Sequence, residues 1–242
     1  MSTPLDVNMP AFWEEVYQGG RAGWDLGGPT PIFCRLLASG QFSPGRVIVL
    51  GAGRGHDARE FARHGFTVTA VDFAADAVRD MRALADPRAP IEFLQADIFA
   101  LPHTLDETFD YVLEYTCFCA IDPPRRAEYA DLVARLLRPG GIYIALIFPL
   151  DDHVGGPPFA VSVSEIFALF GARGFTLLRR ETPADSVPQR RGLEQLLIFQ
   201  APSKLSRRRG GRREAVSNQD IQATGSLSQN RLPLPGLLSA PI

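Results

Sequence analysis

The sequence predicts an α/β fold with a seven-stranded, mostly parallel sheet, helices on both of its faces and an antiparallel pair of strands at one edge. Between residues 46 and 200, short β-branched runs alternate with longer runs of helical periodicity, which is typical of a parallel sheet. The last two strand-like runs have no helix between them, which favours an antiparallel pair. The hydrophobic share of 45% is enough for a sizeable core.

The strands and helices follow one another in a regular order. Runs rich in Val, Ile, Phe and Tyr predict strands at 46–51, 66–72, 91–97, 109–115, 142–148, 175–180 and 195–200. Apolar residues with helical spacing predict helices at 56–64, 77–85, 129–137 and 164–171. The segment Pro139-Gly140-Gly141 predicts a helix stop and a turn before the fifth strand, which leads into a loop rich in Asp, Gly and Pro.

Composition divides the chain into two parts. Residues 1–202 hold 18 arginines and no lysine against 25 acidic residues, whereas residues 203–242 hold seven basic residues against two acidic ones. We expect one folded domain over residues 1–202 and a disordered, arginine-rich tail over 203–242, because the tail lacks apolar periodicity. The acidic body argues against duplex nucleic acid as a partner, since phosphate binding needs clustered lysine and arginine.

Several other protein classes do not fit this sequence. Cys34, Cys117 and Cys119 form no CxxC pair, so neither a disulfide framework nor a metal site is expected. The first ten residues lack the basic and apolar segments of a signal peptide. The longest apolar run, Ile142–Leu150, is far shorter than the ~20 residues of a membrane span. A cytoplasmic protein without membrane contact is therefore expected.

The segment from Gly51 to Gly55, GAGRG, predicts a nucleoside-binding turn between a strand and a helix. Gly51, Gly53 and Gly55 allow a sharp turn and let a ligand approach where a Cβ would clash. Asp72 ends the next strand, where a carboxylate can accept hydrogen bonds from both ribose hydroxyls of an adenosine ligand. Without Asp72, a plain glycine-rich turn would explain the glycines equally well.

Two further positions favour S-adenosylmethionine over a dinucleotide. The dinucleotide fingerprint needs a third glycine so that a helix N-terminus can meet pyrophosphate, and His56 stands at that place. S-adenosylmethionine carries no phosphate and does not need this glycine. Asp97, which ends the third strand, can accept from the adenine amino group while Ile98 packs on the ring. The alternative for Asp97 is a simple turn former.

In this order, the motifs resemble a class I S-adenosylmethionine-dependent methyltransferase, whose fold is Rossmann-like. Further segments resemble the thiopurine methyltransferase superfamily and, within it, the halide/thiol methyltransferases. These segments are Trp24-Asp25-Leu26-Gly27, the GAGRGHD turn, Phe118-Cys119-Ala120-Ile121 and the loop from Asp152 to Pro158. The resemblance covers residues 12–200 and leaves the tail unexplained.

The resemblance implies a lid over residues 1–40 that folds across the cofactor with its aromatic side chains. These would be Trp13, Tyr17 and Trp24, with Tyr17 standing where relatives often carry another tryptophan. An aromatic face attracts a sulfonium cation, which suits this assignment. The alternative for Trp13 is a place in the buried stripe of an amphipathic helix together with Phe12 and Val16.

The resemblance also points to residues near the transferred methyl group. Glu114, where the family usually has Asp, would orient the methionine amino group, and Tyr115 would line the acceptor pocket unless it merely caps the sheet. Cys117 and Cys119 are expected to be small buried groups, because direct transfer needs no enzyme nucleophile. His153 is a candidate base for a thiol acceptor, with a solvated loop histidine as its alternative.

The sequence thus predicts a methyltransferase that moves the methyl group of S-adenosylmethionine to a thiol, hydrosulfide or halide by in-line displacement. No metal is implied, and a monomer is expected. Another small acceptor, such as a thiopurine-like heterocycle or a metalloid oxyanion, is the alternative, because a fold does not decide the substrate. Two other classes are open. One is a nicotinamide-dependent oxidoreductase, against which His56 argues, and the other is a non-catalytic nucleoside-binding regulator.

Overall fold

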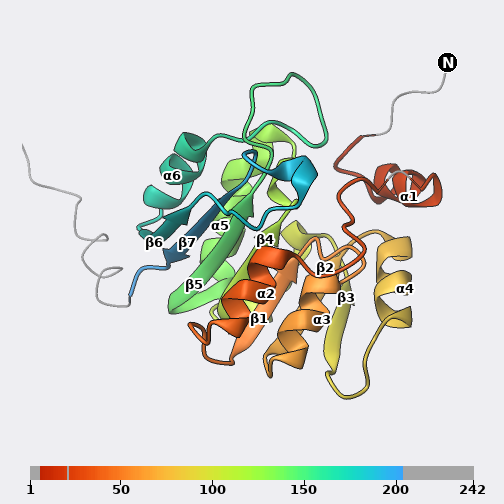
Figure 1. Cartoon of the computed structure of the whole chain (residues 1–242), viewed down its shortest axis with the longest axis horizontal. Coiled ribbons are helices and arrows are strands. Elements are labelled where there is room, and N and C mark those ends of the chain that lie inside the picture. The colour runs from red at the N-terminus through yellow and green to blue at the C-terminus, as the bar shows by residue number, and fades with distance from the viewer. Residues whose placement is uncertain (1–5, 21, 204–242) are drawn as a thin grey trace, which may run out of the picture.

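The computed structural model describes residues 6–20 and 22–203, so the predicted tail lies almost entirely outside the described residues. The described part forms one seven-stranded sheet flanked by helices (Figure 1). The strands are β1 (Arg46–Leu50), β2 (Thr67–Asp72), β3 (Ile91–Gln95), β4 (Phe109–Tyr115), β5 (Leu137–Ile147), β6 (Thr176–Glu181) and β7 (Gln195–Gln200). The α-helices are α1 (Pro10–Gln18), α2 (Pro31–Ala38), α3 (His56–Arg63), α4 (Ala75–Ala83), α5 (Arg126–Leu136) and α6 (Val163–Gly171).

The sheet has the strand order β3-β2-β1-β4-β5-β7-β6. Strands β1 to β5 are parallel to one another, whereas β7 runs antiparallel to both β5 and β6. This confirms the predicted mostly parallel sheet with an antiparallel edge pair. The order reverses at β1, which has β2 on one side and β4 on the other. In open α/β sheets, ligands bind at the carboxyl ends of the strands beside such a switch point.

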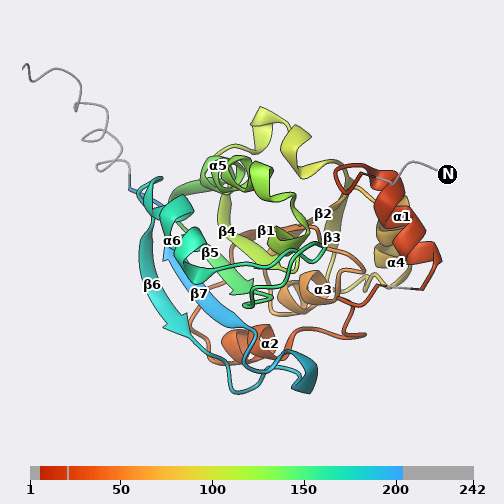
Figure 2. The same cartoon turned by 90° about the horizontal axis from the view of Figure 1, so that it is seen from above.

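Helices cover both faces of the sheet, with α5 and α6 on one face and α2 and α3 on the other (Figure 2). Side chains of β1 alternate between the two cores, because successive residues of a strand point to opposite faces. Ile48 and Leu50 belong to the core under α5 and α6, and Val47 and Val49 to the core under α2 and α3. No helix of the described residues is long and apolar enough to cross a membrane.

Two local predictions need correction. The segment Leu137–Gly141 belongs to β5 rather than to a turn before it, although α5 does end at Leu136. Phe109 pairs with Leu137 and Tyr111 with Ile142, so residues 138–141 bulge out of the ladder. Helix α2 was not expected, although it buries Ile32, Phe33, Leu36 and Leu37 with helical spacing.

Candidate active site

A cavity of about 600 Å³ lies at the carboxyl ends of the central strands. Its walls come from three parts of the chain. The N-terminal part contributes Phe12, Trp13, Val16, Tyr17 and Trp24. The carboxyl ends of the strands and the residues just after them contribute Gly51, Asp72, Asp97, Ile98 and Thr116. The later segments contribute Phe148, Pro157, Pro158 and Arg190. This size is in the usual range for a cavity that binds small molecules.

The glycine turn between β1 and α3 needs glycine at all three positions. Gly51, Gly53 and Gly55 have φ values of +61°, +56° and +70°, which side-chain-bearing residues rarely adopt. A Cβ on Gly51 would lie 2.8 Å from the Cys117 sulfur. A Cβ on Gly53 would lie 3.3 Å from the Tyr17 hydroxyl, so this part of the turn faces the N-terminal segment at close range.

Asp72 connects the turn to the end of β2. Its carboxylate accepts hydrogen bonds from the backbone N–H of Gly53 at 2.9 Å and of Ala74 at 3.0 Å. Burial raises the pKa of this carboxyl, which is only 7% exposed. Each carboxylate oxygen can accept more than one hydrogen bond, so Asp72 can still accept from a ligand in the cavity that it lines.

Asp97 and Ile98 follow β3 and line the same cavity. The Asp97 carboxylate accepts from the backbone N–H of Phe99 at 2.9 Å and so starts the short 3₁₀ helix Ile98–Ala100. Asp97 is therefore a turn former that also presents its carboxylate to the cavity. The guanidinium of Arg125 lies 3.8 Å from the centre of the Phe99 ring, next to this part of the wall.

The three predicted aromatic residues of the N-terminal segment contact one another. The rings of Trp13 and Tyr17 each lie 5.4 Å from that of Trp24, in edge-to-face geometry. The Trp13 indole N–H donates to the carbonyl of Val7 at 2.9 Å. None of the side chains of α1 is fully buried, so its apolar stripe faces the cavity rather than the protein core. Figure 1 shows α1 beside α4 at the edge of the molecule.

Glu114 lies beneath the cavity wall instead of on it. Its carboxylate is 1% exposed and accepts from the backbone N–H of Phe118 at 2.9 Å and from the Tyr129 hydroxyl at 3.0 Å. Burial raises the pKa of Glu114 to about 7. In this position it holds the chain that follows β4, and it is not among the residues that line the cavity.

Tyr115 faces a second, smaller cavity of about 60 Å³. Both cavities are bordered by Trp24, Gly51 and Thr116, so they adjoin at these residues. The Tyr115 hydroxyl lies between the side chains of Arg190 and Glu194 and hydrogen-bonds to both. Burial raises the pKa of this hydroxyl, which therefore stays protonated at neutral pH.

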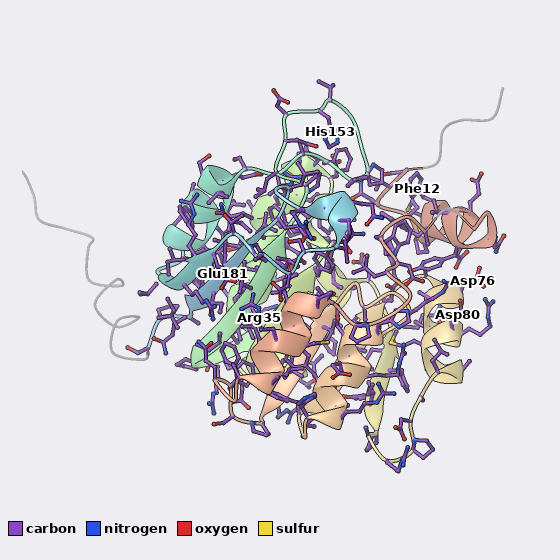
Figure 3. The ribbon with its side chains drawn as sticks, viewed as in Figure 1. Phe12, Arg35, Asp76, Asp80, His153 and Glu181 are labelled. Carbon is purple, nitrogen blue, oxygen red and sulfur yellow. The ribbon has the colours of Figure 1, made fainter. Side chains whose placement is uncertain are left out.

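His153 lies on an exposed loop after β5, outside the cavity wall (Figure 3). Its Nδ1 lies 2.5 Å from the Asp151 carboxylate and its Nε2 lies 2.8 Å from the carbonyl of Pro158. Both partners are acceptors, and the Asp151 hydrogen bond raises the pKa of the imidazole. This arrangement suits a protonated histidine and does not favour a base at the cavity.

Two residues that the fold brings to the cavity were not expected from the sequence. Arg190, 6% exposed, donates to the carbonyl of Trp24 at 2.9 Å, and its guanidinium lies 4.8 Å from the centre of the Phe148 ring. It stands in a run of polar residues before β7, which resembles any exposed loop. Thr116 has a φ of +63°, a strained conformation for a β-branched residue that is typical of functional sites.

Known proteins resemble this chain in sequence and in structure. The family model described as Thiopurine S-methyltransferase matches residues 8–208. Probable thiol methyltransferase 2 of Arabidopsis thaliana is 36% identical over 79% of this chain and 85% of its own length. Thiocyanate methyltransferase 1 of Brassica oleracea is 33% identical over 76% of this chain and 82% of its own length.

Two solved structures illustrate the shared fold. The 1,6-didemethyltoxoflavin-N1-methyltransferase of Burkholderia thailandensis, with bound S-adenosylhomocysteine, gives a TM-score of 0.64 at 20% identity, over 84% of this chain and 94% of that one. The magnesium protoporphyrin IX methyltransferase of Synechocystis PCC 6803, with bound S-adenosylmethionine, gives 0.62 at 15% identity, over 83% of this chain and 100% of that one.

Proposed function

The chain belongs to the thiopurine S-methyltransferase family and is an S-adenosylmethionine-dependent methyltransferase, and from this premise we propose that its methyl acceptor is a small, soft, anionic nucleophile. Thiolates, hydrosulfide and halides are acceptors of this kind. The names of two relatives, a thiol and a thiocyanate methyltransferase, support this choice.

One observation carries the proposal: the described wall of the cavity offers no side chain that is poised to take a proton from an acceptor. The carboxylates of Asp72 and Asp97 line the cavity but are held by backbone N–H groups, and we assign them to the ribose and adenine of the donor rather than to the acceptor. Cys117 and Cys119 are buried, as expected, and burial raises the pKa of their thiols. An acceptor that reacts here should arrive already ionised, as a thiolate or halide does and an alcohol does not.

The residues present fit the methyl donor. Gly51 lines the cavity without a side chain that would fill it, and the Asp72 carboxylate lines the same cavity as an acceptor for ribose hydroxyls. We assign Asp97 to the adenine amino group and Ile98 to the face of the ring. Trp13, Tyr17 and Trp24 offer aromatic surface to a cation. When bound, S-adenosylmethionine supplies an electrophilic methyl group on a positively charged sulfur.

The other end of the cavity suits the acceptor. Phe148, Pro157 and Pro158 give it an apolar wall, and Arg190 contributes positive charge. Arg190 forms no direct ion pair among the described residues: its guanidinium shares the Tyr115 hydroxyl with the buried Glu194 carboxylate. Because Arg190 also lines the cavity, we assign it to attracting the anion. The chain thereby aligns the reactants and excludes water from the soft anion, which raises its nucleophilicity.

An acceptor screen tests this proposal. Purified protein should release S-adenosylhomocysteine when it is given labelled S-adenosylmethionine together with iodide, thiocyanate, hydrosulfide or thiophenol. Phenol is the matched control, because it has the shape of thiophenol but is un-ionised at neutral pH. Methylation of phenol alone would overturn the proposal. Methylation of a thiopurine or a metalloid oxyanion without the simple anions would favour the alternative acceptors instead.

Four properties stay predictions at this point. They are a lid that extends to residue 40, a monomeric state, a cytoplasmic location and the lack of a nucleic-acid partner. Size-exclusion chromatography with light scattering would test the monomer directly. The positions of Trp13, Tyr17 and Trp24 on the cavity wall support the lid.

A further inference from the structure

The side chains that follow the glycines in the GAGRGHD turn contact the N-terminal segment. Arg54 donates to one oxygen of the Asp25 carboxylate at 2.5 Å, and Nε2 of His56 lies 3.1 Å from the other oxygen. The backbone N–H and the hydroxyl of Thr30 donate to Asp57 at 2.7 and 2.9 Å. The loop over residues 22–30, between α1 and α2, is thus attached at two points.

His56 is held in one protonation state by its surroundings. Its Nδ1 lies 2.8 Å from a guanidinium nitrogen of Arg59, a residue that is 6% exposed. Because arginine can only donate, Nδ1 accepts, and the proton of the neutral imidazole sits on Nε2, on the side of Asp25. Burial lowers the pKa of His56, which keeps the ring neutral. His56 therefore hydrogen-bonds to a buried arginine of α3 through Nδ1, while its buried Nε2 meets the Asp25 carboxylate in a close polar contact that lacks hydrogen-bond geometry.

The attachment point is next to a residue of the donor site. Asp25 follows Trp24, which borders both cavities, and the Asp25 carboxylate also accepts from the backbone N–H of Gly27 at 2.8 Å. A shift of Asp25 would move the main chain of Trp24. Arg54, His56 and Asp57 line only the smaller cavity, so they do not form part of the main wall.

We propose that Arg54, His56 and Asp57 are positioning residues that hold the loop 22–30 closed over the bound donor, acting through Asp25 and Thr30. The inference rests on the proposed function, because it presumes that the donor binds at the glycine turn. The same turn then shapes the donor site with its glycines and holds the lid with its other side chains. Opening of these contacts would accompany the release of S-adenosylhomocysteine.

Tryptophan fluorescence is a suitable probe of the lid. The chain has only two tryptophans, Trp13 and Trp24, and both lie in this N-terminal part. We would titrate S-adenosylhomocysteine and methylthioadenosine, which lacks the amino-acid end. Loss of a hydrogen bond to a charged group changes affinity by about ten- to hundredfold, and we expect the lower end because Arg54 still contacts Asp25.

The expected result for His56→Ala is a roughly tenfold weaker binding of both ligands. His56→Gln should bind within about threefold of wild type, because the glutamine amide offers one acceptor to Arg59 and one donor to Asp25. His64→Ala is the matched control, since His64 is exposed at the other end of α3. Thr30→Val removes only the hydrogen bond from the Thr30 hydroxyl to Asp57 and should also weaken the binding of both ligands. This variant provides the test if His56→Ala does not fold.

Three outcomes separate the possibilities. If the alanine variant weakens S-adenosylhomocysteine but not methylthioadenosine, His56 contacts the amino-acid end of the ligand and the positioning role is wrong. If neither ligand is affected in the folded variants, the proposal is overturned as well. If the wild-type chain binds neither ligand, it is the proposed donor site that fails.

Discussion

Replacement of Glu114 by glutamine distinguishes a structural carboxyl from one that contacts the donor. The carboxyl is fully enclosed, and burial raises its pKa from the ordinary 4.5 to about 7. Because the folded-state pKa is the higher one, the protonated acid is favoured by folding. Its stabilising contribution is complete below about pH 4.5 and is lost as the pH rises through about 7.

The size of this effect follows from the shift. A change of about 2.5 pKa units corresponds to about 3 kcal/mol, of which about 2 kcal/mol is lost between pH 5.5 and pH 8. Glutamine can keep both contacts, since its carbonyl accepts from the N–H of Phe118 and its amide can donate to the Tyr129 hydroxyl. The free energy of unfolding of Glu114→Gln should therefore rise by about 2 kcal/mol relative to that of the wild type when the pH is raised from 5.5 to 8.

Urea unfolding of both proteins at the two pH values measures this difference. In thermal unfolding it corresponds to roughly 4–8 °C for a chain of this size. An equal stability difference at both pH values would show that the carboxyl does not titrate as the structure implies. S-adenosylhomocysteine binding gives the second readout. A tenfold weaker affinity in the folded variant would place Glu114 on the donor, as the sequence suggested, whereas the structure predicts little change.

Three further substitutions test the assignment of the cavity residues. Arg190→Gln should raise KM for thiocyanate at least tenfold, because a charge-assisted contact with the anion is lost, and should weaken S-adenosylhomocysteine binding by less. The control is Arg191→Gln at the exposed neighbouring position. Equal KM values for the two variants would refute the anion site. His153→Ala should keep kcat/KM within about twofold of wild type at pH 7. A hundredfold loss of kcat/KM, the usual effect of removing a base, would show that His153 is a catalytic base after all. Trp24→Ala should weaken S-adenosylmethionine binding roughly tenfold while Trp24→Phe retains most of the affinity, because a cation–π contact with the sulfonium needs an aromatic face. Equal binding of S-adenosylmethionine by both variants would remove Trp24 from the donor site.

The arrangement of the sheet was accessible from the sequence because its signals are local. The first three strand runs ended at glycine or aspartate and helical stripes lay between the runs. The absence of a helix between the last two runs indicated the edge pair. The segment Leu137–Gly141 was misjudged because proline and glycine favour both turns and bulges. Only the pairing of Leu137 with Phe109 of β4, ahead of that of Ile142 with Tyr111, makes it part of a strand. Helix α2 was missed although its apolar spacing was visible.

The donor side of the site was also largely visible in the sequence. Gly51, Gly53, Gly55 and Asp72 follow strand ends, and parallel strands bring their carboxyl ends to one edge of the sheet. The residues proposed for the acceptor side were not visible in this way. Arg190 is separated from Trp24 by 166 residues, and no periodicity or motif relates a loop arginine to a distant carbonyl.

The sequence by itself determined the fold, the glycine turn and the family to which the chain belongs, because these rest on periodicity and on motifs that lie close together in the chain. Only the tertiary structure decided which side chains share a cavity. It placed His153 outside the wall and Glu114 beneath it, and it brought His56, first noted as a missing glycine, within 3.1 Å of Asp25 in the loop 22–30. The physical reason is that burial and long-range hydrogen bonds depend on packing between distant segments, which local sequence patterns do not encode.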